Sequence, residues 1–208
     1  MVGTVLFSLK FSRKTSERKR VHEASKLTKM KNLLVLAILV LGFFALINNS
    51  GFAHRAELTK DTAVLPFKYA GLLTKQPDEK IQIPVRSVGA RQIADTWHAP
   101  RQADRLHQGQ DIFAPRGTPV YSATEGYVFR LGENSLGGNT VSVLGAGGRV
   151  YYYAHLDKHA ADLAAGKFVT PETIIGYVGS TGNAQGTPPH LHFGVYTMSG
   201  AINPLTLF

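Results

Sequence analysis

Two histidines two positions apart stand in the run PPHLHFGVY, residues 188–196. Successive side chains of a strand point to opposite faces, so His190 and His192 would share one face while Leu191 and Phe193 share the other. The pair is therefore typical of metal ligation or catalysis at one spot. The other interpretation is two solvent-facing histidines on an edge strand.

A second pair with metal-binding chemistry occurs in HQGQD, residues 107–111. His107 and Asp111 are four residues apart, an even spacing that would keep both on one face of a strand. Gly109 between them removes a side chain that would crowd that face. An imidazole and a carboxylate that converge on one point are the beginning of a zinc site, although such a pair can also be an ordinary surface hydrogen-bonding pair.

A fifth candidate, His155, ends the aromatic run in YYYAHLD, residues 151–157. Taken by itself it could be a hydrogen-bonded histidine packed beside tyrosines. Its occurrence in one chain with the other two motifs is what favours a functional site.

Short β-rich runs separated by Gly, Asn, Ser and Pro turns must position these residues. They follow one another from residue 81, and the first, IQIPV, is expected to be an edge strand because it contains Pro84. Only KHAADLAAG, residues 158–166, is typical of a helical turn. The pattern predicts an all-β domain over residues 81–208, either a sandwich or a barrel.

The part before residue 81 has a different composition. Residues 1–31 form a basic arm that carries +7 of the formal net charge of +9, so the remaining charge does not indicate a nucleic-acid surface. Residues 33–47 have no polar side chain, and residues 32–53 are predicted to be a signal peptide cut after Ala53 or an uncleaved membrane anchor. Met30 is an alternative start. Residues 54–80 are expected to be a linker or lead-in, and the absence of cysteine excludes thiolate metal sites.

The succession HQGQDIFAPRGTPVYSATEGYV, YYYAHLD, GKFVTPETIIGYVGSTG, PPHLHFGVY and INP closely resembles the lysostaphin-type zinc endopeptidases, which cut peptide cross-links of bacterial cell walls. The resemblance covers about residues 94–204. It implies a small antiparallel β-sandwich of the duplicated hybrid motif fold, with a groove over one sheet. One departure is Gly194 after HLHF, where many relatives carry Glu.

The resemblance also implies a role for each of the five residues. His107, Asp111 and His192 would bind one Zn²⁺, and His155 and His190 would be the unligated catalytic pair. Three ligands leave a fourth position for water, as in catalytic zinc sites. The expected function is an exported zinc endopeptidase that acts on peptidoglycan peptides in the periplasm or cell envelope, associated with the inner membrane if residues 33–47 are retained. The alternative is a non-catalytic wall-binding regulator of other hydrolases.

Overall fold

The computed structural model describes residue 23, residues 68–101 and residues 105–208. The chain divides into two units, Met1–Glu57 and Leu58–Phe208, and the description below concerns the second. The predicted basic arm and the predicted signal or anchor at residues 32–53 lie outside the described residues, apart from Glu23. Within the described part of the chain, no helix is long and apolar enough to span a membrane.

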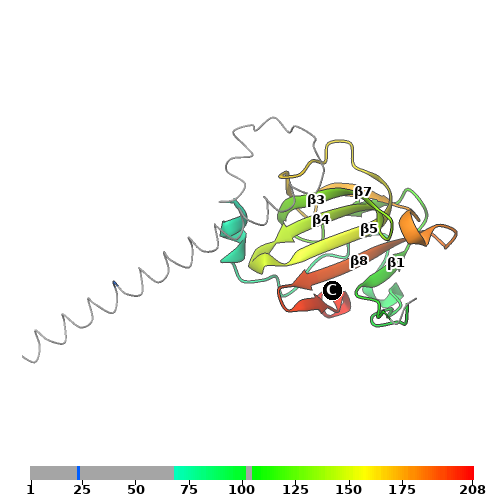
Figure 1. Ribbon diagram of the computed structural model, residues 1–208, viewed down its shortest axis with the longest axis horizontal. Helices are drawn as coiled ribbons and strands as arrows, with labels where there is room; N and C mark the ends of the chain where they lie inside the picture. The colour runs from blue at the N-terminus through cyan, green and yellow to red at the C-terminus, as the bar shows by residue number, and fades with distance from the viewer. Residues whose placement is uncertain (1–22, 24–67, 102–104) are drawn as a thin grey trace, which may run out of the picture. The chain divides into compact units, whose positions relative to one another are not determined.

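Nine strands are linked into one antiparallel sheet, whose longest path runs in the order β1-β8-β5-β4-β3-β6 (Figure 1). On this sheet β2 pairs with β7, β7 also pairs with β5, and β9 pairs with β8. The strands are β1 (Gln110–Phe113), β2 (Pro119–Tyr121), β3 (Gly126–Asn134), β4 (Gly138–Gly145), β5 (Val150–His159), β6 (Phe168–Val169), β7 (Ile174–Val178), β8 (His190–Thr197) and β9 (Gly200–Ile202).

The described elements also include four short 3₁₀ turns: η1 (Ala90–Gln92), η2 (Ala146–Gly148), η3 (Gly182–Ala184) and η4 (Pro204–Leu207). The predicted all-β class is therefore confirmed. Two local predictions were wrong. Residues 158–166 are the end of β5 and a turn instead of a helix, and residues 81–85 form no strand. The backbone of IQIPV makes separate hydrogen bonds to two different segments: Ile81 N–H donates to Leu207 O and Gln82 N–H donates to Ala123 O. It forms no strand ladder, since Pro84 has no N–H to donate.

The last part of the predicted lead-in packs on the domain. Residues 68–73 are helical, and Tyr69 and Leu72 are buried. The ring of Tyr69 lies 5.9 Å from that of Tyr127 and 6.2 Å from that of Phe129, both on β3. These residues are thus part of the second unit.

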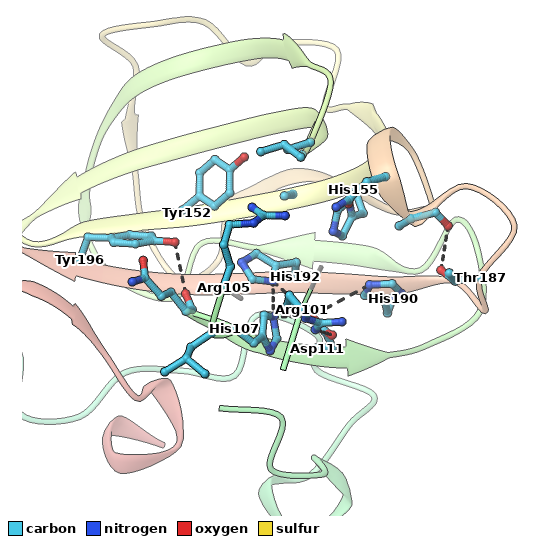
Figure 2. Close-up of a pocket in the computed structure, with 17 residues that line it drawn as sticks. Arg101, Arg105, His107, Asp111, Tyr152, His155, Thr187, His190, His192 and Tyr196 are labelled. Atoms are coloured by element: carbon cyan, nitrogen blue, oxygen red, sulfur yellow. Dashed lines mark hydrogen bonds and ion pairs between the residues drawn. The ribbon is translucent and has the colours of Figure 1, made fainter. Parts of the chain in front are cut away.

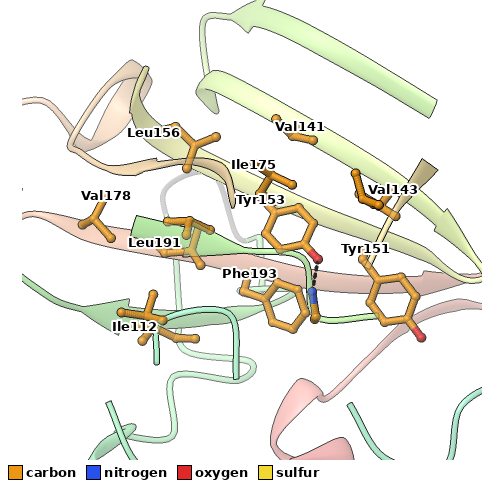
Figure 3. Packing of buried hydrophobic residues seen from close by; sticks show 14 of the residues in the cluster. Ile112, Val141, Val143, Tyr151, Tyr153, Leu156, Ile175, Val178, Leu191 and Phe193 are labelled. Carbon is orange, nitrogen blue, oxygen red and sulfur yellow. Dashed lines mark hydrogen bonds between the residues drawn. The ribbon is translucent and has the colours of Figure 1, made fainter. Parts of the chain in front are cut away.

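One buried cluster joins side chains of the long sheet with those of β2 and β7 (Figure 3). Strand alternation directs every second side chain into this cluster. Tyr151 and Tyr153 of β5 and Leu191 and Phe193 of β8 are all fully buried in it. Burial of a large apolar side chain contributes about 1.5–3 kcal/mol. The Tyr153 hydroxyl keeps a polar partner in this core, since it accepts a hydrogen bond from Ala123 N–H at 2.8 Å.

The alternation of β5 is broken at His155, whose backbone φ is +61°. Before this residue β5 pairs with β8, as Ala154 opposite His192, and after it β5 pairs with β7, as Leu156 opposite Val178. Ala154 and His155 consequently line the same pocket, whereas Tyr153 and Leu156 on either side are fully buried in the core. A left-handed residue at the point where a strand changes partner therefore re-aims one side chain, as β-bulges do.

We expect the free energy of unfolding of His155→Gly to be about 1 kcal/mol higher than that of His155→Ala. The reason is that a Cβ atom disfavours the left-handed conformation and glycine has no Cβ. The measurement is denaturant unfolding of both variants in the presence of a chelator. As a control, Lys158 is exposed on the same strand and is not among the residues of positive φ. There the order should reverse, with the glycine variant less stable than the alanine variant. The same order at both positions would contradict the assignment of strain to His155.

Candidate metal centre

A pocket of about 610 Å³ lies over the face formed by β5 and β8 and the start of β1 (Figure 2). All five predicted site residues line it: His107, Asp111, His155, His190 and His192. Further walls are provided by Arg101, Arg105 and Leu106 from the segment before β1, by Leu136 and Gly137, by Tyr152 and Tyr196, and by residues 183, 184 and 187 after β7.

Three of these side chains could hold one metal ion. His107 Nε2 lies 2.8 Å from His192 Nδ1, and Asp111 Oδ1 lies 3.1 Å from the first nitrogen and 3.2 Å from the second. A tetrahedral zinc ion with bonds of about 2.0–2.1 Å has its ligands about 3.3 Å apart. The triangle of donor atoms therefore fits such an ion with small adjustments. Among the described residues no fourth His or acidic group belongs to this cluster, and three protein ligands are typical of catalytic zinc sites.

Strand register places two of the three ligands. Asp111 of β1 is directly opposite His192 of β8, and His192 is in turn opposite Ala154 of β5. Residues opposite each other on paired strands have their side chains on one face, so Asp111 and His192 meet. The predicted shared face of His190 and His192 is confirmed, since both line the pocket while Leu191 is in the core.

His107 reaches the site by a different route from the one predicted. It lies three residues before β1 instead of on one strand with Asp111, so a bend at Gly109, not strand alternation, brings the two together. The prediction that Gly109 leaves room is confirmed. A Cβ at this position would lie 2.6 Å from His192 Cε1 and 2.8 Å from the carbonyl oxygen of Phe193.

Two interactions orient the ligands from behind. His107 Nδ1 is 2.7 Å from the carbonyl oxygen of Thr96, so Nδ1–H donates there and the Nε2 lone pair faces the site. Arg101 Nη2 donates to Asp111 Oδ2 at 2.5 Å, which leaves Oδ1 toward the two histidines. Figure 2 shows Arg101 beside Asp111.

The charge state of the cluster suits a cation. Burial by itself would raise the pKa of Asp111, but hydrogen bonds and charge interactions with His107 and His192 outweigh it and hold that pKa well below its usual range. Burial lowers the pKa of His192, against the opposing effect of Asp111. At neutral pH the set is thus a carboxylate with a neutral His192, the protonation states that metal binding requires.

His155 and His190 flank the three ligands without joining them. Their rings lie 5.1 Å apart, and the ring of His155 is 5.8 Å from that of His192. His155 Nδ1 is 2.9 Å from Thr181 O and His190 Nδ1 is 2.8 Å from Pro188 O, so in both residues Nδ1–H is directed to a carbonyl and Nε2 is left for other partners. Burial lowers the pKa of His155 to about 4, although its bond to Thr181 acts in the opposite direction.

Residues 105–204 match Peptidase family M23. They make up most of the predicted domain 81–208 and contain all five predicted site residues, from His107 to His192. The domain therefore belongs to this family of peptidases, and the resemblance recognised in the sequence is confirmed.

Three curated relatives illustrate the family. The L-Ala–D-Glu endopeptidase of Bacillus subtilis (strain 168) is 41% identical over 101 residues, which are 46% of this chain and 31% of the relative. The peptidoglycan DD-endopeptidase ShyC of Vibrio cholerae is 32% identical over 103 residues, 50% of this chain and 23% of the relative. Lysostaphin of Staphylococcus simulans is 38% identical over 90 residues, 42% of this chain and 17% of the relative. The chain thus spans less than a third of the length of each of these relatives.

The structure brings all five predicted side chains to one pocket, while the division into ligands and catalytic residues stays a prediction. Sequence reasoning missed the groups that support them: Arg101, Thr96, Tyr152 and Tyr196. Tyr196 Oη donates to Gln108 O at 3.2 Å, and the Tyr152 ring lies 6.2 Å from that of His192. The two tyrosines follow the pocket-facing alternation of β5 and β8 and could have been found from it. Thr96 and Arg101 belong to irregular segments that give no such signal.

We expect Gly109→Ala to lower zinc affinity by about 10-fold or more, because the added methyl group would displace the His192 ring. The methyl group would also lie against the backbone carbonyl oxygen of Phe193, which cannot move aside as a side chain can. Affinity is measured by competition with a chromogenic chelator. The matched control is Gly132→Ala on β3, where an added Cβ meets nothing within 4 Å. Unchanged affinity in Gly109→Ala would mean that the His192 ring is not held against residue 109.

Proposed function

We propose that this chain is an exported zinc-dependent endopeptidase that hydrolyses peptide bonds in the peptide cross-links of bacterial peptidoglycan. The observation that carries the proposal is the convergence of His107, Asp111 and His192 on one point of a pocket that also contains two further imidazoles. Membership of a peptidase family supports hydrolysis, and the name of the Vibrio relative supports peptidoglycan as the substrate.

A bound zinc ion would supply Lewis acidity and a water molecule of lowered pKa. The chain's own residues would handle the protons of the reaction. His155 is neutral at pH 7 because its pKa is about 4, so its Nε2 can accept a proton from the attacking water. His190, whose Nδ1 is likewise committed to a backbone carbonyl and whose ring is 5.1 Å from that of His155, could donate to the developing oxyanion or to the leaving amine when its Nε2 carries a proton.

The geometry is compatible with either histidine in either role, since both are held in the same tautomer by carbonyl acceptors. Tyr152 and Tyr196 add hydroxyl groups and ring faces along the same pocket, where an extended peptide would lie. Export is supported by the sequence alone, through the basic arm and the apolar run 33–47. It would place the domain in the periplasm or cell envelope, free or anchored to the inner membrane.

We expect the purified chain to contain about one zinc ion and to release peptides from purified peptidoglycan in a chelator-sensitive manner. His107→Ala and Asp111→Ala should lose the metal. His155→Ala and His190→Ala should retain it and lose turnover by about 10²–10⁴-fold, because each removes a proton-transfer group. Metal analysis and mass analysis of the released fragments are the measurements, and the fragments identify the bond that is cut.

The matched control is His159→Ala, which removes a β5 histidine that does not line the pocket. It should keep both metal and activity. Zinc-loaded protein that releases no peptide would favour the non-catalytic regulator, whereas normal zinc content in Asp111→Ala would overturn the ligand assignment.

A further inference from the structure

Gln110 is the one amide among the largest fully buried side chains of the described domain, and all its polar groups are paired. Its Oε1 accepts hydrogen bonds from Thr96 N–H at 2.9 Å and from Thr96 Oγ1–H at 3.0 Å. Its Nε2 donates to Asp95 Oδ1 at 2.9 Å and to Asn203 Oδ1 at 3.2 Å. Four bonds from one buried side chain thus join three separate parts of the chain.

The position does not need a polar residue for the fold. Gln110 and Ile112 alternate with Asp111 along β1, and both are completely buried on the side away from the pocket. An apolar side chain is the ordinary occupant of such a site, because an amide there must satisfy every one of its groups. The precise pairing therefore indicates a purpose other than core packing.

Thr96, which donates two of these bonds, touches both of the neighbouring metal-ligand candidates. Its carbonyl oxygen accepts the Nδ1–H of His107 at 2.7 Å, and its hydroxyl oxygen accepts the backbone N–H of Asp111 at 3.0 Å. The same hydroxyl donates its proton to Gln110, so its orientation is fixed by the buried amide. A rotation of Thr96 would shift the His107 ring and the start of β1 together.

We propose that Gln110 is a positioning residue of the metal centre, which acts by holding Thr96 against His107 and Asp111. The inference rests on the proposed metal site. The far end of the network explains the INP motif, because Asn203 Oδ1 accepts from Gln110 and also from Leu205 N–H at 3.0 Å, which caps η4. The C-terminal turn is thereby connected to the ligands through two side chains.

The test is Gln110→Leu in the full chain, a substitution that keeps side-chain volume and suits the buried site. We expect zinc affinity, measured by competition with a chromogenic chelator, to fall about 10–100-fold, as it does when an outer partner of a metal ligand is removed. The Co²⁺-loaded protein should also show an altered visible absorption spectrum, since the His107 ring is no longer fixed. Wild-type affinity and an unchanged spectrum would overturn the proposal.

Ser122→Ala is the control that distinguishes a specific effect on the metal centre from general destabilisation. It removes a different buried hydrogen bond, from Ser122 Oγ–H to Thr124 O, and Ser122 does not line the pocket. This control should keep zinc affinity and the Co²⁺ spectrum even where its unfolding temperature falls as far as that of Gln110→Leu. An equal loss of affinity in both variants would assign the effect to general destabilisation and overturn the proposal.

Thr96 provides a second route if Gln110→Leu does not fold. Thr96→Val should lose affinity and Thr96→Ser should regain it, because serine restores the hydroxyl. Where Gln110→Leu does fold, its loss of affinity and that of Thr96→Val should not add in the double variant, since both act through one contact. Wild-type affinity in Thr96→Val would contradict the inference. Absence of zinc binding by the unmodified chain would instead contradict the proposed function.

Discussion

The register between β1 and β8 is the constraint on which the rest of the site depends. It sets Asp111 opposite His192, and in the same step it sets Ile112 opposite Leu191 in the core. A slip by one residue would reverse every side chain, turning imidazoles into the core and leucine toward the pocket. The apolar core therefore selects the arrangement that gathers the donor atoms, and the site needs no separate device to fix the pairing of these strands.

His155 adds the complementary departure from regularity. A regular β5 would direct this side chain into the core, on the face of Tyr151 and Tyr153. Its left-handed backbone turns the ring toward His190 instead, and the bond from its N–H to Gly137 O at 2.7 Å helps to hold that conformation. Strained residues of this kind persist where surrounding structure over-determines them, and they cluster at functional sites.

The class of fold and the five principal residues could be predicted from sequence because both depend on short-range patterns. The two-residue period of a strand indicates that His190 and His192 share one face, and the order of the motifs along the chain indicates the other three residues. What escaped prediction depends on contacts between distant segments. Thr96 and Arg101 reach the ligands from irregular chain, and the route of His107 depends on a bend. The predicted helical turn at residues 158–166 was wrong because Lys158 and His159, at the end of β5, pair with β7.

The place of β1 at the edge of the sheet has a kinetic consequence. It is four residues long and, among the described strands, pairs with β8 alone, yet it carries Asp111 and continues directly from His107. Brief fraying of this edge would dismantle the donor triangle while β8, β5 and β4 kept their ladders. We therefore expect the lifetime of a bound ion to follow local opening of β1, so that metal can be exchanged by a folded molecule.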